Sequence, residues 1–338
     1  MPTKKIQLAI IYESDRGGET KATQHISTSL EKNILVDIKK LQLEPLLRTS
    51  FKRYFSWLLY SIYKTHQFLN TELSNNQSVV YTTTFTAGFA TILYNFKKPI
   101  QLIFHYHGSR IPTFEKNITQ FLKFFSAYIL QALVFSFAKK IIVTSKYSKE
   151  RIVTDFPHIK KEKIIIIDNG IDLQEFRTFS KLEKIKNRKK YQLKNNEIAI
   201  TNISRMVNTK GIIKLLYVFA RLQKKYQNLH LFLVYPTVKN NSENNYKKKV
   251  SWIIKNKNIQ PVTLIENANM PEIYALSDLL VSFSEEENYP LVLLEAYASH
   301  TKFVTSNKEV LALQKKLSKK DGNDLSWDTV ASQILKLV

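Results

Sequence analysis

The chain has 338 residues, a length that favours two domains over one. Its hydrophobic content of 44% excludes global disorder, and the absence of Cys excludes a disulfide scaffold, an iron–sulfur cluster and a Cys nucleophile. The net charge of +23 is spread over both halves of the chain and favours a polyanionic partner such as nucleic acid, anionic lipid or a phosphate-bearing ligand. A compositional drift towards Lys, Asn and Ile accounts for this charge equally well.

Short β-branched runs alternate with longer helical stretches in the first half of the chain. The first run, Ile6 to Ile11, is too short for a signal peptide and is typical of a buried strand. The uncharged stretch from Phe124 to Ala138 is interpreted as a core helix, with a monotopic membrane contact as the minor alternative. Strands are predicted at residues 6–12, 33–38, 78–82, 100–105, 141–145 and 163–168, which indicates a parallel α/β sheet.

A second α/β series follows a basic connector. Its predicted strands are 197–203, 229–235, 262–265, 279–283 and 302–305, and its predicted helices are 212–226, 246–256, 271–276 and 291–299. The sequence therefore indicates two α/β domains in tandem, whose ligands would bind at the carboxyl ends of the strands. The expected organisation is an N-terminal domain (1–173), a basic linker (174–192), a C-terminal domain (193–325) and a final helix (326–338).

The strongest local signal is an acidic loop between a strand and a helix over residues 282–296. Pro290 is typical of a helix start, where free backbone N–H groups can hold an anion. Glu287 lies at the mouth of this helix and Glu295 two turns further, so both carboxylates could bind sugar and ribose hydroxyls. The alternative is an acidic helix cap followed by one surface Glu.

Two further turns follow predicted strands. Arg205 and Lys210 lie five residues apart in a strand-to-helix turn, where both could reach one diphosphate; the alternative is a solvated basic turn. Gly17 and Gly18 would let the backbone approach a ligand closely at a helix start, or they form a simple tight turn. No dinucleotide fingerprint and no Gly-Lys-Ser/Thr phosphate loop occurs in the sequence.

Two histidines end a predicted buried strand. His107 could donate a hydrogen bond to a sugar hydroxyl or take part in proton transfer. A metal bound by His105 and His107 is disfavoured because no carboxylate lies within easy spacing, and His105 is expected to be structural and to point to the opposite face.

These signals, in this order and together with the turn Asn169-Gly170-Ile171-Asp172, resemble glycosyltransferase family 4. The resemblance covers most of the chain, and its most specific element is the Glu-x7-Glu spacing of Glu287 and Glu295. It implies the GT-B fold: two Rossmann-like domains facing across a cleft. It also implies a nucleotide-diphosphate sugar as co-substrate, transfer with retention of configuration, and no metal or other cofactor.

The resemblance assigns a role to each candidate residue. Arg205 and Lys210 would neutralise the departing diphosphate, assisted by backbone N–H groups at the start of the motif helix. Glu287 would bind the donor sugar and Glu295 the ribose. His107 would hydrogen-bond the transferred sugar, and the glycine loop would pass close to the donor and acceptor. The catalytic residues so implied are His107, Arg205, Lys210 and Glu287, and the donor-binding residues are Gly17, Gly18, Asn288, Leu291, Val292 and Glu295.

The sequence departs from the family at three places. Asn288 stands where a Gly usually follows the first motif Glu, which would narrow the sugar pocket. His300 stands where a Gly is usual after the motif helix. The chain after Val304 is short for the family, so the second domain is expected to be shortened near its C-terminus.

The sequence therefore predicts a hexosyltransferase-type enzyme of cell-envelope, capsular or exopolysaccharide biosynthesis, with a lipid-linked or polysaccharide acceptor. A basic amphipathic helix over residues 48–69 would bring a cytoplasmic protein to the inner face of the plasma membrane as a peripheral contact; a core helix is the equal alternative. A non-catalytic scaffold subunit with a partner glycosyltransferase is a second hypothesis. A nucleic-acid-binding protein is a remote third one, because no nucleic-acid-binding signature accompanies the charge, and no nucleic-acid partner is expected.

Overall fold

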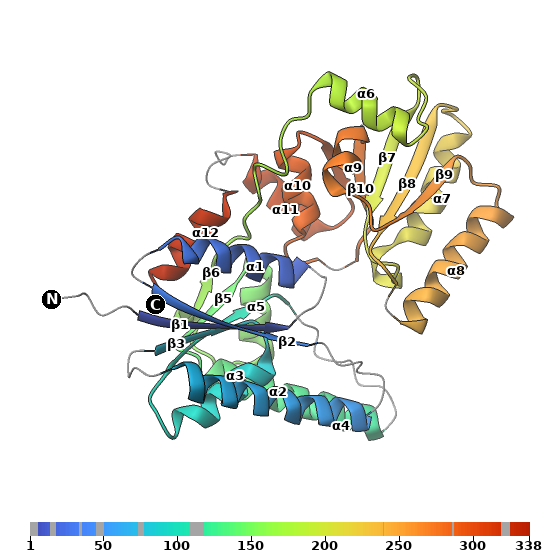
Figure 1. The fold of residues 1–338 in the computed structure, drawn as a ribbon. Helices are drawn as coiled ribbons and strands as arrows, with labels where there is room; N and C mark the ends of the chain where they lie inside the picture. Colours follow the sequence, from blue (N-terminus) through green and yellow to red (C-terminus); the bar gives the residue numbers. More distant parts are fainter. Residues whose placement is uncertain are drawn as a thin grey trace. The chain divides into compact units, whose positions relative to one another are not determined.

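The computed structural model describes residues 6–13, 18–33, 36–44, 51–73, 78–108, 118–238, 240–285, 287–318 and 325–338 (Figure 1). The chain forms two compact units. The first unit comprises residues 1–170 and 327–338, and the second comprises residues 171–326.

The first unit contains a six-stranded, fully parallel sheet in the order β2-β1-β3-β4-β5-β6. Helices cover both of its faces, as expected for a parallel sheet. Its strands are β1 (Ile6–Glu13), β2 (Val36–Leu43), β3 (Ser78–Thr82), β4 (Gln101–Tyr106), β5 (Lys140–Val143) and β6 (Ile164–Ile166). Its helices are α1 (Gly18–Glu31), α2 (Phe51–Glu72), α3 (Phe85–Asn95), α4 (Ile118–Phe137), α5 (Lys146–Asp155) and α12 (Trp327–Leu335), with a short 3-10 turn at Lys161–Lys163.

Alternate side chains along the buried strands fill a core on one face of the first sheet. Ala9 and Ile11 of β1 pack with Val80, Phe104 and residues of α2, α3, α4 and α5 on one face of the sheet. The second half of α4 belongs to this core through Val134 and Phe135, and Ala138 follows directly after the helix, which confirms a core helix for that half of the uncharged stretch. No helix in the part of the chain that the structure describes is long and apolar enough to cross a membrane.

The last helix of the chain belongs to the first unit. α12 packs against α1 (Figure 1), where the rings of Trp327 and His25 stack with centroids 5.3 Å apart and Lys32 Nζ lies 2.8 Å from Asp328 Oδ1. The same tryptophan explains the glycine of the Asn-Gly turn, because a Cβ on Gly170 would lie 2.7 Å from the Trp327 ring. The first unit is thus closed by a segment from the far end of the chain.

The second unit contains a five-stranded parallel sheet in the order β11-β10-β7-β8-β9. Its strands are β7 (Ile198–Ile203), β8 (Leu229–Tyr235), β9 (Val262–Glu266), β10 (Leu279–Ser282) and β11 (Lys302–Thr305). Its helices are α6 (Lys181–Lys190), α7 (Ile212–Gln223), α8 (Asn241–Asn256), α9 (Met270–Leu276), α10 (Leu291–Ala298) and α11 (Lys308–Leu317), with a 3-10 turn at Asn208–Lys210.

The predicted basic linker is part of this second unit. Residues 181–190 form α6, whose start is fixed by a capping box between Ser180 and Glu183, and the helix packs against α9. Its cations face solvent, as the composition indicated, but Arg188 and Lys190 pair with Asp278 and Glu272 of the same unit. Between β11 and α12 the described residues hold one helix, α11.

Candidate active site

The order of the strands places two loops of the second unit together. The chain runs from β7 to β8 and β9 on one side, and β10 and β11 lie on the other side of β7. The strand order therefore reverses between β7 and β10, and open α/β sheets bind ligands at such a reversal, outside the carboxyl ends of the strands. The loops that leave β7 and β10 there are residues 204–211 and 283–290, the two strongest motifs of the second domain.

A glycine brings these two loops into contact. Gly211 has φ +65°, in the left-handed region that favours glycine, and a Cβ at this position would lie 2.2 Å from the backbone oxygen of Phe283. Next to it, the backbone oxygen of Thr209 accepts hydrogen bonds from Glu285 N at 2.9 Å and Ser284 Oγ at 3.4 Å. The turn after β7 is thus held directly against the loop after β10.

This contact joins two residues that the sequence assigned to different parts of the donor. Lys210 Nζ and Glu287 Oε1 form an ion pair, and each side chain is only 18% exposed. A neighbouring pair, Lys214 Nζ to Glu285 Oε1 at 2.6 Å, is well exposed. Arg205 lies exposed on the same turn as Lys210. The interpretation of residues 204–211 as a merely solvated basic turn is therefore wrong for Lys210.

The start of α10 has the backbone geometry of an anion site. Pro290 is the N-cap residue and its side chain makes no capping hydrogen bond, so the first N–H groups, including those of Leu291 and Val292, open the helix without a side-chain cap. Asn288 and these two residues are half-buried. The positive end of the helix dipole thus lies in the same loop as Glu287.

Glu295 is enclosed by the second unit. Its side chain is part of a residue only 8% exposed, and its Oε2 accepts a hydrogen bond of 2.6 Å from Tyr274 OH. Burial, followed by the nearby charge of Glu295, raises the pKa of the Tyr274 hydroxyl well above its usual value. The alternative that Glu295 is a surface residue is wrong, and Tyr274 is a positioning residue that the sequence did not identify.

Asn307 is a second residue that holds this site together and that the sequence did not identify. Its Nδ2 donates to the backbone oxygens of Ser284 at 3.3 Å and Glu285 at 3.2 Å, and its Oδ1 accepts from Glu309 N and Val310 N at the start of α11. Asn307 therefore ties the acidic loop to α11. The signal was present, because Asn two residues before Glu at a helix start is typical of an N-cap.

In the first unit the two histidines lie on the same side of the end of β4. The rings of His105 and His107 stack with centroids 4.0 Å apart and an interplanar angle of 30°, so the expected opposite orientation is wrong. Tyr81 OH lies 2.5 Å from His105 Nδ1. Residues two apart in a strand point to the same face, and His107 directly follows the end of β4 at Tyr106, so it continues the alternation that orients His105.

Burial controls the protonation of this stack. It lowers the pKa of His107 to about 4, and burial together with neighbouring His107 lowers the pKa of His105 well below its usual value. Both imidazoles are therefore neutral near pH 7, which suits hydrogen bonding to a sugar hydroxyl. Gly18 is the first residue of α1. Gly17 lies outside the described residues.

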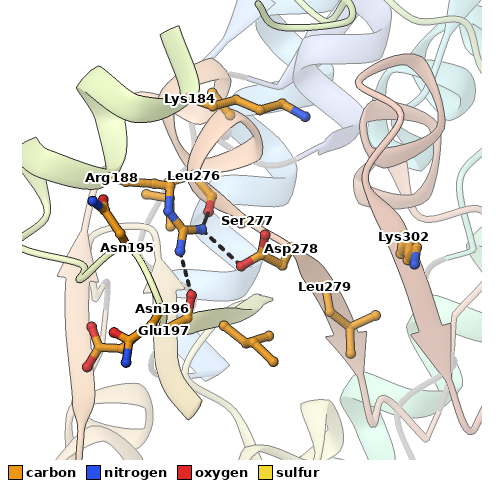
Figure 2. A pocket seen from close by; sticks show the side chains of 12 residues that line it. Lys184, Arg188, Asn195, Asn196, Glu197, Leu276, Ser277, Asp278, Leu279 and Lys302 are labelled. Atoms are coloured by element: carbon orange, nitrogen blue, oxygen red, sulfur yellow. Dashed lines mark hydrogen bonds and ion pairs between the residues drawn. The ribbon is translucent and has the colours of Figure 1, made fainter. Parts of the chain in front are cut away.

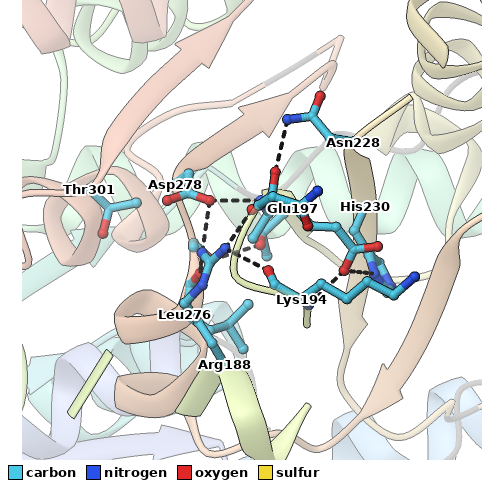
Figure 3. A network of polar contacts seen from close by, with 12 residues as sticks. Arg188, Lys194, Glu197, Asn228, His230, Leu276, Asp278 and Thr301 are labelled. Carbon is cyan, nitrogen blue, oxygen red and sulfur yellow. Dashed lines mark hydrogen bonds and ion pairs between the residues drawn. The ribbon is translucent and has the colours of Figure 1, made fainter. Parts of the chain in front are cut away.

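A separate hollow of about 640 Å³ lies at the opposite, amino-terminal edge of the second sheet. Figure 2 shows its wall, in which Arg188 reaches from α6 towards the start of β10, and none of the predicted site residues lines it. Arg188 donates to Asp278 Oδ2 at 2.9 Å and to the backbone oxygen of Glu197 at 2.5 Å, and Asp278 Oδ2 also accepts from Ala199 N at 2.8 Å. These bonds (Figure 3) give Arg188 a structural role in fastening α6 to the sheet.

Two family models match the chain. Residues 183–316 match the model described as glycosyl transferases group 1, and residues 14–175 match the model described as glycosyltransferase family 4. The capsular polysaccharide biosynthesis glycosyltransferase CapM of Staphylococcus aureus is 27% identical over 219 residues, which are 62% of this chain and 53% of CapM. The chain thus matches about half of the length of this curated relative.

Solved structures resemble the whole chain in fold. Sucrose-phosphate synthase from Thermosynechococcus elongatus has a TM-score of 0.73 at 15% identity, covering 98% of both chains. The Anabaena protein HepE in complex with UDP and glucose has a TM-score of 0.68 at 16% identity, again covering 98% of both chains. Two matching family models, two parallel α/β units and this likeness in fold together place the chain in the glycosyltransferases of the GT-B fold.

Proposed function

We propose that the chain transfers a hexose from a nucleotide-diphosphate sugar to a glycan or lipid-linked acceptor in cell-envelope, capsular or exopolysaccharide biosynthesis. The observation that carries the proposal is the partly buried pairing of Lys210 with Glu287 beside the uncapped start of α10. A cation, a carboxylate and a helix dipole in one loop cluster match the three demands of a nucleotide sugar: diphosphate charge, sugar hydroxyls and phosphate oxygens.

The proposed chemistry is stabilisation of the leaving diphosphate. Negative charge grows on the diphosphate as the bond to the sugar breaks, and preorganised cations lower the energy of that state. Lys210 and the exposed Arg205 would supply this charge together with the N–H groups of Leu291 and Val292, so that the reaction needs no metal. Glu287 would orient the sugar, and Glu295, fixed by Tyr274, would bind the ribose.

The first unit would supply the hydrogen bond to the transferred sugar through the neutral ring of His107. Gly17 and Gly18 would pass close to the donor and acceptor. Transfer with retention of configuration is proposed on the family resemblance. Asn288 would add an amide to the sugar pocket where the family usually has Gly, and this amide would narrow the choice of sugar.

The relatives favour particular substrates. CapM is named as a capsular polysaccharide biosynthesis glycosyltransferase, and the HepE structure contains UDP and glucose. We therefore take UDP-hexoses as the first donors to test and an envelope glycan or its lipid carrier as the acceptor. A protein that acts on a lipid carrier would work in the cytoplasm as a peripheral protein of the inner membrane face.

The test is a thermal-shift panel of UDP, GDP and their hexoses with the wild type and Lys210→Ala. A bound donor stabilises the protein by mass action, so a shift with one nucleotide family is expected, and Lys210→Ala should remove it. Lys214→Ala is the matched control, because Lys214 forms the neighbouring but exposed pair with Glu285 and should leave the shift unchanged. No shift with any donor would contradict the proposal.

A non-catalytic scaffold is the second candidate, favoured by Asn288 and by the single described helix between β11 and α12. The two candidates differ in the cell. If Arg205→Ala and Glu287→Ala restore glycan production in a deletion strain as well as the wild type does, the protein acts as a non-catalytic scaffold and the proposal of an enzyme is wrong.

A further inference from the structure

Three aromatic side chains of the first unit contact one another in a row that ends at the candidate site. Tyr81 OH lies 2.5 Å from His105 Nδ1, and the two rings meet edge to face with centroids 5.9 Å apart. His105 then stacks on His107 with centroids 4.0 Å apart. Tyr81 and His105 are buried, whereas His107 is half-buried. We call these three residues the three-ring cluster.

The register of the sheet explains why the three rings meet. Tyr81 of β3 is the partner of Ile103 of β4, and His105 follows Ile103 by two residues, so Tyr81 and His105 lie on the same face of the sheet. His107 continues this alternation beyond the end of β4. The cluster therefore runs along the strands and ends at the carboxyl edge, where a parallel sheet binds its ligands.

The hydrogen bond from Tyr81 selects one tautomer of His105. Burial, followed by the charge of Glu19, raises the pKa of the Tyr81 hydroxyl, so this group keeps its proton. Within the described part of the chain, the hydroxyl has one hydrogen-bond partner, His105 Nδ1. If Nδ1 carried a proton, the buried O–H group would have no acceptor, which is costly. Tyr81 therefore donates to Nδ1, and the proton of the neutral imidazole lies on Nε2.

His105 is a costly residue for its place in the sheet. Its register partner in β5 is Ile142, and its Nε2 is buried without a hydrogen-bond partner among the residues that the structure describes. A buried N–H group without an acceptor lowers stability, and an apolar side chain would avoid this loss. Positions where a sequence sacrifices stability are expected at functional sites.

The contact with His105 bears on the ring that lies at the candidate site. β4 pairs with β5 up to Tyr106, so His107 lies beyond the strand ladder and side-chain contacts orient its ring. We propose that Tyr81 and His105 are positioning residues: Tyr81 fixes the ring of His105, and this ring fixes the ring of His107 in the orientation that binds the transferred sugar. The inference rests on the proposed function for the role of His107 and adds two residues that act through it.

The first experiment removes one oxygen atom from the cluster. Tyr81→Phe keeps the ring but releases His105, so kcat for hexose transfer should fall about tenfold to a hundredfold, as expected when a group that orients the substrate is slightly misplaced. KM for the donor and the thermal shift with donor should stay unchanged, because the second unit holds the donor. Tyr94→Phe is the matched control: Tyr94 meets His66 edge to face at 5.8 Å near the far end of α3, and its variant should keep the wild-type kcat.

Two double variants separate support of the ring from a merely structural role. Tyr81→Phe with His105→Phe leaves no polar group at either position and keeps a flat ring against His107, so kcat should recover. Tyr81→Phe with His105→Leu is equally apolar but offers no flat ring, so kcat should stay low. A purely structural role would change the melting temperature and kcat of both double variants alike.

A spectroscopic measurement tests the cluster without activity. The chain has seven histidines, and in 15N-histidine-labelled protein the His105 signal, identified by its loss in the double variants, should be that of the Nε2–H tautomer. In Tyr81→Phe the His105 signal should become that of a mixture of tautomers, and the His107 signal should shift because its neighbour is no longer fixed.

Three results would overturn the inference. Tyr81→Phe could transfer hexose at the wild-type kcat, the two double variants could have equal kcat, or the His107 signal could be the same in Tyr81→Phe as in the wild type. A wild type that neither responds to donors nor transfers sugar would contradict the proposed function instead. The histidine signals would still decide whether Tyr81 and His105 position His107.

Discussion

Lys210 and Glu287 lie 77 residues apart in the chain and form an ion pair where the loops after β7 and β10 meet. The positive charge lies on the loop after β7 and the negative charge on the loop after β10, so the direction of the pair is set by these two positions. If Lys210 acts on the diphosphate and Glu287 on the sugar, exchanging the two residues should keep the pair and lose the function.

The charge-exchange experiment tests this polarity. Lys210→Glu alone and Glu287→Lys alone each put like charges side by side and should lower the free energy of unfolding by about 1 kcal/mol, a modest cost because both groups keep some contact with water. The double variant should recover the wild-type melting temperature but not the shift with donor, because the cation now lies on the wrong loop. Donor binding by the double variant at wild-type strength would contradict the assigned roles.

Gly211 should be intolerant of any side chain. Gly211→Ala introduces a Cβ at a left-handed position and against the Phe283 backbone oxygen, so we expect a loss of about 3 kcal/mol in the free energy of unfolding. The loop after β10 would have to move, so the response to donor should disappear as well. Denaturant melts and the donor shift measure both effects.

Gly88→Ala is the control for this substitution. A Cβ on Gly88 would meet methyl groups of Val134 at 2.9 Å and 3.0 Å, but alanine is favoured over glycine inside a helix by about 1 kcal/mol. The net loss of stability should be smaller than for Gly211→Ala, and donor binding should persist. If Gly211→Ala binds the donor as well as Gly88→Ala does, the close approach of the two loops is not needed for donor binding.

Much of this architecture follows from local sequence. Most strands lie within two residues of their predicted bounds, because β-branched runs bounded by turns identify buried parallel strands. The exception is β2, predicted at 33–38 and observed at Val36–Leu43, since Lys39 and Lys40 interrupt the apolar pattern of this edge strand. Strand order then explains why the Lys210 and Glu287 motifs meet.

The parts that were missed depend on contacts between distant segments. The hydrogen bond from Tyr274 to Glu295 joins two helices, and Asn307, at the start of α11, donates to the backbone oxygen of Ser284, 23 residues earlier; neither leaves a periodic pattern in the sequence. The return of Trp327 to the first unit is also a result of tertiary packing. Propensity identifies Asn307 as a helix cap, but neither propensity nor spacing tells which distant residues such side chains contact.

His300 is a site where substitution should stabilise the protein. It follows the C-cap of α10 with φ +53°, and the hydrogen bonds from His300 N to Tyr297 O and from Thr301 N to Ala296 O are those of a glycine-type helix end. A left-handed conformation costs a residue with a Cβ about 1 kcal/mol, so His300→Gly should raise the free energy of unfolding by about that amount.

A control separates this effect from general tolerance of glycine. Lys224 ends α7 in the right-handed conformation, so Lys224→Gly should give no gain. His300→Gly should leave donor binding unchanged if His300 only closes the helix. A loss of donor binding in His300→Gly would instead assign the imidazole to the substrate pocket.

The buried histidine stack should make the stability of the first unit depend on pH. In the unfolded chain histidine titrates near pH 6.5, whereas burial lowers the pKa of His107 to about 4 and that of His105 well below its usual value. Between these limits the unfolded state binds protons that the folded state does not, so the free energy of unfolding falls as the pH falls from 6.5 towards 4. The slope should be about 1.4 kcal/mol per pH unit for each histidine and should vanish above pH 7.

Urea melts across this range with the wild type and His107→Asn measure the effect. The variant should lose about half of the slope below pH 6.5 and should match the wild type's flat response above pH 7, where both imidazoles are already neutral in both states. Because the same variant removes the ring proposed to bind the transferred sugar, it should also lower the transfer rate at pH 7.5, where stability is not limiting. A slope that is unchanged in His107→Asn would mean that the ring is not held neutral by burial.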